Sequence, residues 1–390
     1  MTALLGNYNR ADVTFVRGEG CTLYDEAGNA YLDFIGGIAV CALGHAHPAI
    51  ADAVAQQART LVHVSNLYHH EPAGTLAREL TARSGFARAF FCNSGTEANE
   101  AAIKLARKFA YRSGEVERTT ILACTGSFHG RTFGALAATA NDAYKVGFGP
   151  MLEGFSFTPF NDVAALEHHL DSKVAAMIVE PVQGESGVHP ADLAFLEAAR
   201  RLCNERGALL IFDEIQCGMG RIGPLFAFQH FGVVPDVITM AKALANGLPI
   251  GAMLVNERVS NALQPGDHGT TFGGSPIPCA AALAHLRVRD HLDLERHVNA
   301  EHAYIMAVLN DVATHHPTVF GPPRGLGLLI GLPVLEPHKA ADIVAAARER
   351  GVLIGSGGGN TLRFAPPLIV TSKEIDRLGE LLENVTSAAV

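Results

Sequence analysis

The sequence lacks the features that would place the protein in a membrane or on nucleic acid. No uninterrupted apolar run is long enough to cross a bilayer, and residues 1–10 contain no apolar segment of the secretory kind. Lysine and arginine form no stripe, and the net charge is -9, so we expect no nucleic-acid partner. These absences favour a cytoplasmic protein that acts on small molecules.

Cysteine is scarce and scattered. The seven cysteines contain no C-x-x-C pair, so we expect neither a disulfide framework nor a structural zinc site, and a reducing compartment fits better. His45, His47, His69, His70 and His129 invite a metal interpretation, but they form no helical i, i+4 pair with a nearby carboxylate. We predict no bound metal and interpret most of these histidines as structural or solvated.

The middle of the chain, from about residue 88 to residue 255, alternates short apolar runs with amphipathic stretches. This alternation predicts an α/β fold with a mostly parallel sheet. Only nine residues separate Met240 from Ile250, too few for a helical crossover, so one strand is predicted to be antiparallel. The candidate strands are Ala89–Cys92, Thr120–Cys124, Ala175–Val179, Ala208–Phe212, Val237–Met240 and Ile250–Val255, and the candidate helices are Glu97–Tyr111 and Leu193–Glu205.

The two ends of the chain have a different character. Tyr8–Asp33 is typical of short strands joined by turns, whereas helices and then short strands, near Leu328–Pro333 and Leu362–Phe364, follow residue 278. We expect both ends to join in one smaller α+β domain. The predicted division assigns residues 1–50 and 279–390 to the small domain and residues 51–278 to a large domain that binds the cofactor.

A glycine turn lies between a candidate strand and a candidate helix. In this turn, Ser94 and Glu97 have the S-x-x-E spacing of a capping box. A helix N-terminus offers free backbone N–H groups and the positive end of a dipole, which suit a phosphate. Taken alone, the motif is more typical of an ordinary capped helix.

Two charged residues follow apolar strands directly. Asp213 lies where ligands of open α/β sheets bind, at a carboxyl end. A carboxylate there needs a cationic partner, and the protonated ring nitrogen of pyridoxal 5'-phosphate (PLP) would supply one. Lys242 has small, apolar neighbours, and a desolvated lysine is a free amine able to form a Schiff base. Taken alone, Asp213 is as typical of an aspartate that caps a turn, whereas the surroundings of Lys242 favour a functional lysine.

The chain resembles class III (ω-)aminotransferases of PLP fold type I over nearly its whole length. The matching motifs occur in the family's order. They are Leu32–Phe34, Gly44–Pro48, Ser94–Glu100, Phe128–Thr132, Glu180–Glu185, Asp213–Gln216, Lys242, His268–Gly274 and Leu362–Pro367.

The resemblance implies a set of cofactor-binding residues. Asp213 would pair the ring nitrogen, Phe128 would stack on the ring, and Gln216 would bond near its hydroxyl. Lys242 would carry the cofactor and move the proton, and Thr271 would reach the phosphate in a neighbouring subunit. The implied set is Ser94, Gly95, Thr96, Phe128, Asp213, Glu214, Ile215, Gln216, Lys242 and Thr271.

The implied substrate-binding residues are two arginines, a glutamate and a threonine. Arginine's planar fork suits a carboxylate, so Arg131 would bind the amino donor and Arg363 would bind glutamate. Glu185 would mask Arg363 while the ω-amine is bound, and Thr270 would lie on the substrate side.

Three stretches resemble the branch of the family that acts on acetylornithine: Gly36–Val40, Asn246–Ala252 and Arg324–Gly327. That branch implies transfer of the δ-amino group of N-acetylornithine to 2-oxoglutarate, in arginine biosynthesis, by a homodimer with shared active sites.

Several alternatives stay open at this point. Transaminases of succinylornithine, succinyldiaminopimelate, ornithine or 4-aminobutyrate are close alternatives, because the acyl pocket cannot be located. A PLP-dependent aminomutase is an alternative of another class. A dinucleotide-binding protein would need G-x-G-x-x-G in a strand-to-helix turn, which the run Gly355–Gly359 does not provide.

Overall fold

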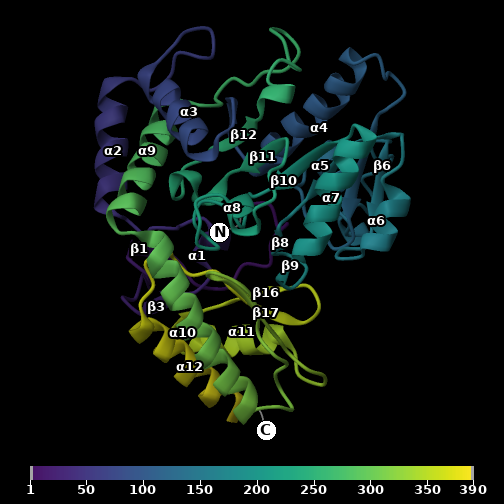
Figure 1. The fold of residues 1–390 in the computed structure, drawn as a ribbon. Coiled ribbons are helices and arrows are strands. Elements are labelled where there is room, and N and C mark those ends of the chain that lie inside the picture. Colours follow the sequence, from purple (N-terminus) through teal and green to yellow (C-terminus); the bar gives the residue numbers. More distant parts are fainter. Residues whose placement is uncertain (1–2, 388–390) are drawn as a thin grey trace.

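A seven-stranded sheet forms the centre of the larger part of the molecule (Figure 1). The structure is a computed structural model and describes residues 3–387. The strand order is β4-β12-β11-β10-β7-β5-β6, and only β12 runs antiparallel to its neighbours. The predicted fold, with its one reversed strand, is confirmed. The strands are β4 (Arg88–Cys92), β5 (Thr120–Cys124), β6 (Phe155–Thr158), β7 (Val174–Val179), β10 (Leu209–Asp213), β11 (Val237–Met240) and β12 (Gly251–Val255).

Helices cover both faces of this sheet, which explains why its central strands are apolar throughout. Alternate residues of β10 enter separate cores: Leu210 and Phe212 pack in the one that includes residues of α7 (Leu193–Arg206). Ile211 packs in the other, with residues of α4 (Gly95–Arg112). The sheet is therefore held rigidly between two layers. The remaining helices near it are α5 (Phe133–Ala138), α6 (Val163–His169) and α8 (Ala227–Phe231).

A smaller part, in the lower half of Figure 1, is built from both ends of the chain. Strand β3 pairs in parallel with β15, so N-terminal and C-terminal segments share a sheet in the order β1-β2-β3-β15. A second sheet has the order β13-β14-β17-β16. The division at residues 50 and 278 stays a prediction. The strands are β1 (Phe15–Glu19), β2 (Thr22–Asp25), β3 (Ala30–Asp33), β13 (Arg324–Leu326), β14 (Leu329–Pro333), β15 (Val352–Leu353), β16 (Gly355–Gly357) and β17 (Thr361–Phe364).

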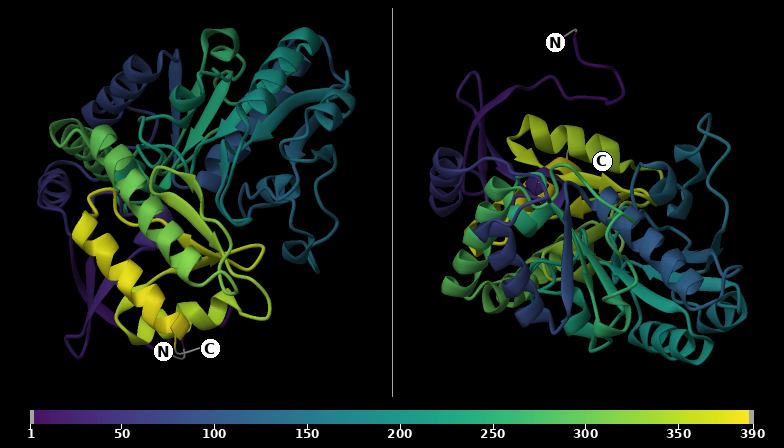
Figure 2. Two further views of the ribbon diagram at one scale, coloured as in Figure 1. Left: turned by 60° about the horizontal axis from the view of Figure 1, so that its bottom comes forward. Right: turned by 90° about the horizontal axis from the view of Figure 1, so that it is seen from above.

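Long helices pack on the small sheets and on the flank of the large one. Helices α10 (Leu294–His315) and α12 (Ser372–Ser387) lie side by side (Figures 1 and 2), next to α11 (Ala340–Glu349). Helix α9 (Pro276–His291) packs on α2 (Pro48–Thr60) and α3 (Glu71–Ser84). Within residues 3–387, no helix is long and apolar enough to cross a membrane. The segment before β1 projects from the body of the molecule (Figure 2, right).

Some of the histidines considered as metal ligands have structural partners. The ring nitrogens of His47 and His70 accept the N–H of Ala49 and Ala73 and so cap α2 and α3. Within residues 3–387, no group of acidic, histidine or cysteine side chains is arranged to hold a metal ion.

His45 is the histidine from which we expect a pH-dependent stability. Its Nε2 lies 2.8 Å from Asp33 Oδ2, and Asp33, followed by Cys41, raises the pKa of His45 to about 9. Since the folded protein binds this proton more tightly than the unfolded chain, the stabilisation is complete below pH 6.5 and is lost as the pH rises through about 9. We expect His45→Gln to destabilise the protein at pH 6 by on the order of 2 kcal/mol, and much less at pH 9.5.

Urea unfolding at the two pH values measures this difference. The exposed His69 provides a control, because His69→Gln should leave the stability unchanged at both. An equal loss for His45→Gln at pH 6 and at pH 9.5 would contradict the assignment.

Candidate active site

A cavity of about 380 Å³ opens at one edge of the large sheet. Strands β4, β5, β7, β10 and β11 end at this edge, and the reversed strand β12 begins there. The volume falls within the range of small-molecule sites. Ten predicted residues line it: Ser94, Gly95, Thr96, Phe128, Arg131, Glu185, Asp213, Ile215, Gln216 and Lys242.

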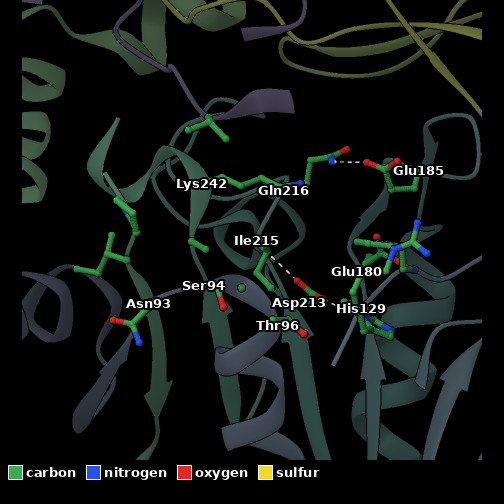
Figure 3. A pocket seen from close by; sticks show the side chains of 18 of the residues that line it. Asn93, Ser94, Thr96, His129, Glu180, Glu185, Asp213, Ile215, Gln216 and Lys242 are labelled. Carbon is green, nitrogen blue, oxygen red and sulfur yellow. Dashed lines mark hydrogen bonds and ion pairs between the residues drawn. The ribbon is translucent and has the colours of Figure 1, made fainter. Parts of the chain in front are cut away.

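Lys242 extends across the upper part of the cavity toward Gln216, above Asp213 and Thr96 (Figure 3). It follows β11 at the start of the short 3-10 helix η2 (Lys242–Ala245), and its φ of 46° lies in the left-handed region. That conformation is strained for a residue with a side chain and is typical of functional sites. Burial lowers the pKa of Lys242, although the carboxylate of Glu185 opposes the shift. The residue therefore provides an accessible amine that loses its proton more readily than an ordinary lysine.

Asp213, the last residue of β10, is held by several donors. Its Oδ2 lies 2.7 Å from Asn99 Nδ2 and 2.8 Å from His129 Nδ1, and its Oδ1 accepts the N–H of Ile215 at 3.1 Å. Asn99 is fixed in turn, because its Oδ1 accepts the hydroxyl of Thr239 at 2.7 Å. Such a network fixes the carboxylate and leaves it able to pair with a cation in the cavity.

The turn before α4, from Ser94 to Thr96, forms another part of the cavity wall. Ser94 Oγ accepts the N–H of Glu97 at 3.3 Å, which is the first half of the predicted capping box. The second half differs, because the Glu97 carboxylate accepts the N–H of Asn93 at 2.5 Å instead of that of Ser94. The N–H groups of Gly95 and Thr96 open the helix, where helix geometry provides no acceptor. They form an anion-binding end next to the cavity.

Phe128 and Arg131 lie on the loop that follows β5. Phe128 meets Tyr144 edge-on, with ring centroids 6.2 Å apart, and the Arg131 guanidinium stands 3.6 Å from the centroid of the Tyr144 ring. Among residues 3–387, no carboxylate pairs with Arg131. Its planar fork is thus oriented by an aromatic ring and open to a carboxylate from outside.

The second arginine is covered. Arg363, on β17, lies 2.5 Å from Glu185 through Nη1 and Oε1, and Gln216 Nε2 donates to the same oxygen at 3.1 Å. Burial alone would raise the pKa of Glu185, but Arg363 and Lys242 together hold it below its usual value. Glu185 is therefore a charged group that neutralises Arg363. Figure 3 shows Glu185 at the edge of the cavity, joined to Gln216.

Besides Arg363, which Glu185 covers, three predicted residues do not line the cavity. Glu214 follows Asp213 but turns away, and its carboxylate accepts the N–H groups of Ala227 and Phe228 at 2.6 and 2.8 Å, capping α8. Thr270 accepts a hydrogen bond from Asn93 Nδ2 at 3.2 Å, and Thr271 is exposed. The structure does not bring these three side chains together with Lys242.

Sequence reasoning gave no role to His129, Asn99 and Glu180. Glu180 lines the cavity and accepts the N–H of Phe128 at 3.0 Å. Burial, followed by the neighbouring Asp213, raises the pKa of Glu180 well above its usual range. Its position just after β7 matches that of Asp213 at the end of β10, and this signal could have identified it.

Comparison with known proteins agrees with this geometry. The family model "Aminotransferase class-III" matches residues 6–386. This chain belongs to the class III aminotransferases. The "Acetylornithine aminotransferase" of Methanocaldococcus jannaschii is 46% identical over 97% of this class III aminotransferase and 94% of the relative. The protein of that name from Pseudomonas putida is 46% identical, over 96% and 92%.

Solved structures show the same fold. The N-acetylornithine aminotransferase of Stenotrophomonas maltophilia superposes on this class III aminotransferase with a TM-score of 0.86 and 36% identity, covering 98% of this chain and 97% of the other. The ornithine aminotransferase of Toxoplasma gondii has a TM-score of 0.95 and 33% identity, covering 99% and 93%.

Class III aminotransferases depend on PLP, and so does this one. Three features of the site fit the cofactor: an anion-binding turn at Gly95–Thr96, a fixed carboxylate at Asp213 and an accessible amine at Lys242. Gly95 is needed for this fit, because a Cβ there would lie 2.8 Å from the side chain of Ile215 at the cavity wall.

Proposed function

We propose that this aminotransferase moves the δ-amino group of N-acetyl-L-ornithine to 2-oxoglutarate, giving N-acetylglutamate 5-semialdehyde and glutamate in arginine biosynthesis. The observation that carries the proposal is that two arginines lie beside one cavity and that a carboxylate covers one of them and not the other. Among residues 3–387 no carboxylate pairs with Arg131, whereas Arg363 is neutralised by Glu185. Two substrates with different carboxylate patterns can therefore use one site in turn. The names of relatives at 46% identity support the same choice of donor.

The residues that would hold PLP have separate tasks. Ser94, Gly95 and Thr96 bind the phosphate, Phe128 covers the ring, and Asp213 keeps the ring nitrogen protonated. Bound PLP supplies an electron sink that stabilises negative charge at the carbon bearing the amine. Lys242 Nζ removes the proton from that carbon of the donor and returns it at the end of each half of the reaction, as general base and then general acid.

Glu185 would decide which substrate is bound. With Glu185 on Arg363, the donor's single carboxylate binds Arg131 and its δ-amine reaches Lys242. The dicarboxylate 2-oxoglutarate offers a second anion that competes with Glu185 for Arg363. Its arrival displaces Glu185 and places the keto group at the reacting position.

The proposed assembly is a homodimer with shared active sites. Thr271 is exposed on its own chain and lies outside its own cavity, which supports a role at the phosphate of a second copy. Exposed apolar side chains such as Phe272 and Phe133 supply surface for such a contact.

A reducing compartment, the cytoplasm, suits the chain because its seven cysteines are free thiols.

Steady-state kinetics with 2-oxoglutarate as acceptor test the proposal. We expect kcat/KM for N-acetylornithine to exceed that for ornithine or 4-aminobutyrate by at least about 10²-fold, because unacylated ornithine adds a buried charge at the α-position. N-succinylornithine and succinyldiaminopimelate complete the set of donors. A preference for unacylated ornithine would overturn the choice of substrate. Turnover without a stoichiometric need for 2-oxoglutarate would instead indicate an aminomutase.

A further inference from the structure

The run Gly355–Gly359, which we call the glycine loop, contributes no group to the binding of the cofactor or of either substrate. It consists of strand β16 and the turn that leads to β17, and it lies at the border between the two parts of the molecule, near β8 (Val182–Gln183) and β9 (His189–Pro190) (Figure 1). Those two strands flank Glu185 on either side. The loop therefore adjoins the segment that carries the carboxylate covering Arg363.

The loop contacts this segment backbone to backbone. The N–H of Gly358 donates to the carbonyl oxygen of Glu185 at 2.8 Å. A Cβ at Gly358 would lie 3.1 Å from Ser186 Cα and O, and one at Gly357 would lie 3.3 Å from Gly187 Cα and 3.4 Å from the Glu185 oxygen. Glycine at these positions therefore lets the two backbones approach closely, and a side chain there would push them apart.

The same hairpin also carries Arg363. In the register of β16 and β17, Gly355 pairs with Arg363. One rigid hairpin therefore holds the arginine directly and, through Gly358, the backbone of its partner Glu185. The ion pair between Arg363 Nη1 and Glu185 Oε1 spans 2.5 Å, so a shift of a few tenths of an ångström between the two backbones changes its geometry.

Arg324 fixes the far end of the segment. Its Nε donates to the carbonyl oxygens of Gly187 and Val188, both at 3.0 Å, and its Nη2 donates to Thr361 Oγ1 at 3.2 Å. The segment after Glu185 is thus anchored downstream by Arg324. Upstream, Arg363 Nη1 donates to the carbonyl oxygen of Gly184 at 3.2 Å, and the carbonyl oxygen of Glu185 itself accepts the N–H of Gly358. The Gly358 N–H is therefore the backbone contact by which the loop reaches Glu185.

We propose that the glycine loop is a specificity-determining element that, through the Gly358 contact with Glu185, sets the balance between covered and free Arg363. This inference rests on the proposed function, because the balance matters only if donor and acceptor use Arg363 differently. The loop residues are positioning residues and touch neither substrate. Lengthening the contact between Gly358 and Glu185 should strengthen the binding of dicarboxylates and weaken the binding of the mono-carboxylate donor.

Graded substitutions test the proposal in the holoenzyme. Gly358→Ala introduces the closest contact, Gly357→Ala a milder one, and Gly359→Asn serves as a control. Gly359 has a φ of 63°, which asparagine tolerates, and its Cβ would come no nearer than 3.9 Å to Ser186. Binding of glutarate, a dicarboxylate that cannot react, is measured by calorimetry, and KM is measured for N-acetylornithine and for 2-oxoglutarate.

For Gly358→Ala we expect glutarate to bind about three- to tenfold more tightly, the size of one weakened hydrogen bond. The KM for 2-oxoglutarate should fall and that for the donor should rise, with a smaller effect in Gly357→Ala and none in Gly359→Asn. In a Glu185→Gln background, Gly358→Ala should have no further effect on glutarate binding.

Unchanged glutarate affinity in both alanine variants would overturn the proposal, as would a rise of both KM values together, which a merely structural loop would give. Failure of the wild-type enzyme to use N-acetylornithine would refute the proposed donor instead. The glutarate comparison would remain valid in that case, because it needs no donor.

Discussion

Replacing Lys242 with alanine is expected to lower the rate of transamination by at least about 10⁴-fold, the upper range for a positioned acid–base group. The reason is that Lys242 supplies the amine that reaches across the cavity and the group that moves the proton. Stopped-flow measurement of a single half-reaction with N-acetylornithine gives the rate of the step directly.

Borohydride treatment and peptide mapping provide a second measurement for the same residue. The wild-type enzyme should acquire the mass of reduced cofactor on the peptide that contains Lys242, and Lys242→Ala should acquire none. Lys173, which is exposed on the surface, is the matched control: Lys173→Ala should behave as wild type. Labelling of another lysine in the wild-type enzyme would refute the role given to Lys242.

Replacing Asp213 with asparagine should lower kcat by about 10²- to 10³-fold. An amide keeps the size of the side chain but removes the charge that would pair with the protonated ring nitrogen. Breaking a buried pair of this kind costs about 3–5 kcal/mol. The amide also places a donor beside Asn99 Nδ2, which now donates to Asp213 Oδ2, so part of the network must rearrange.

The effect of Asp213→Asn must be separated from loss of folding. Glu214→Gln is the matched control, because Glu214 is also buried at the end of β10 but faces α8. We expect Glu214→Gln to lower the melting temperature while leaving kcat within a few-fold of wild type. Equal losses of kcat in the two variants would mean that Asp213 acts through stability alone.

The large sheet and the positions of its functional residues were predictable because their signals are local. An apolar run followed directly by one charged residue indicates a strand end, as at Asp213 and Lys242, and a connection too short for a helix indicates a reversed strand. Strand β6 escaped prediction because Phe155–Thr158 alternates phenylalanine with serine and threonine and so lacks a continuous apolar run.

The partners of Asp213 could not be predicted, because they meet only in three dimensions. Asn99 lies on α4 and His129 follows β5, and both reach Asp213 because α4 and the end of β5 lie at the edge where β10 ends. Glu214 illustrates the opposite problem. It belongs to the same motif as Asp213, but consecutive side chains at a strand end point to opposite sides, so proximity in sequence did not place it in the cavity.

The order of the large sheet has a consequence for synthesis on the ribosome. In the part of the chain that the structure describes, strand β4 pairs only with β12, which begins about 160 residues later in the chain. At roughly 5–20 residues per second, β4 waits on the order of ten to thirty seconds before its partner emerges. The nascent chain therefore carries an unpaired strand while about 160 of its 390 residues are made, and chaperone demand should be greatest in that interval.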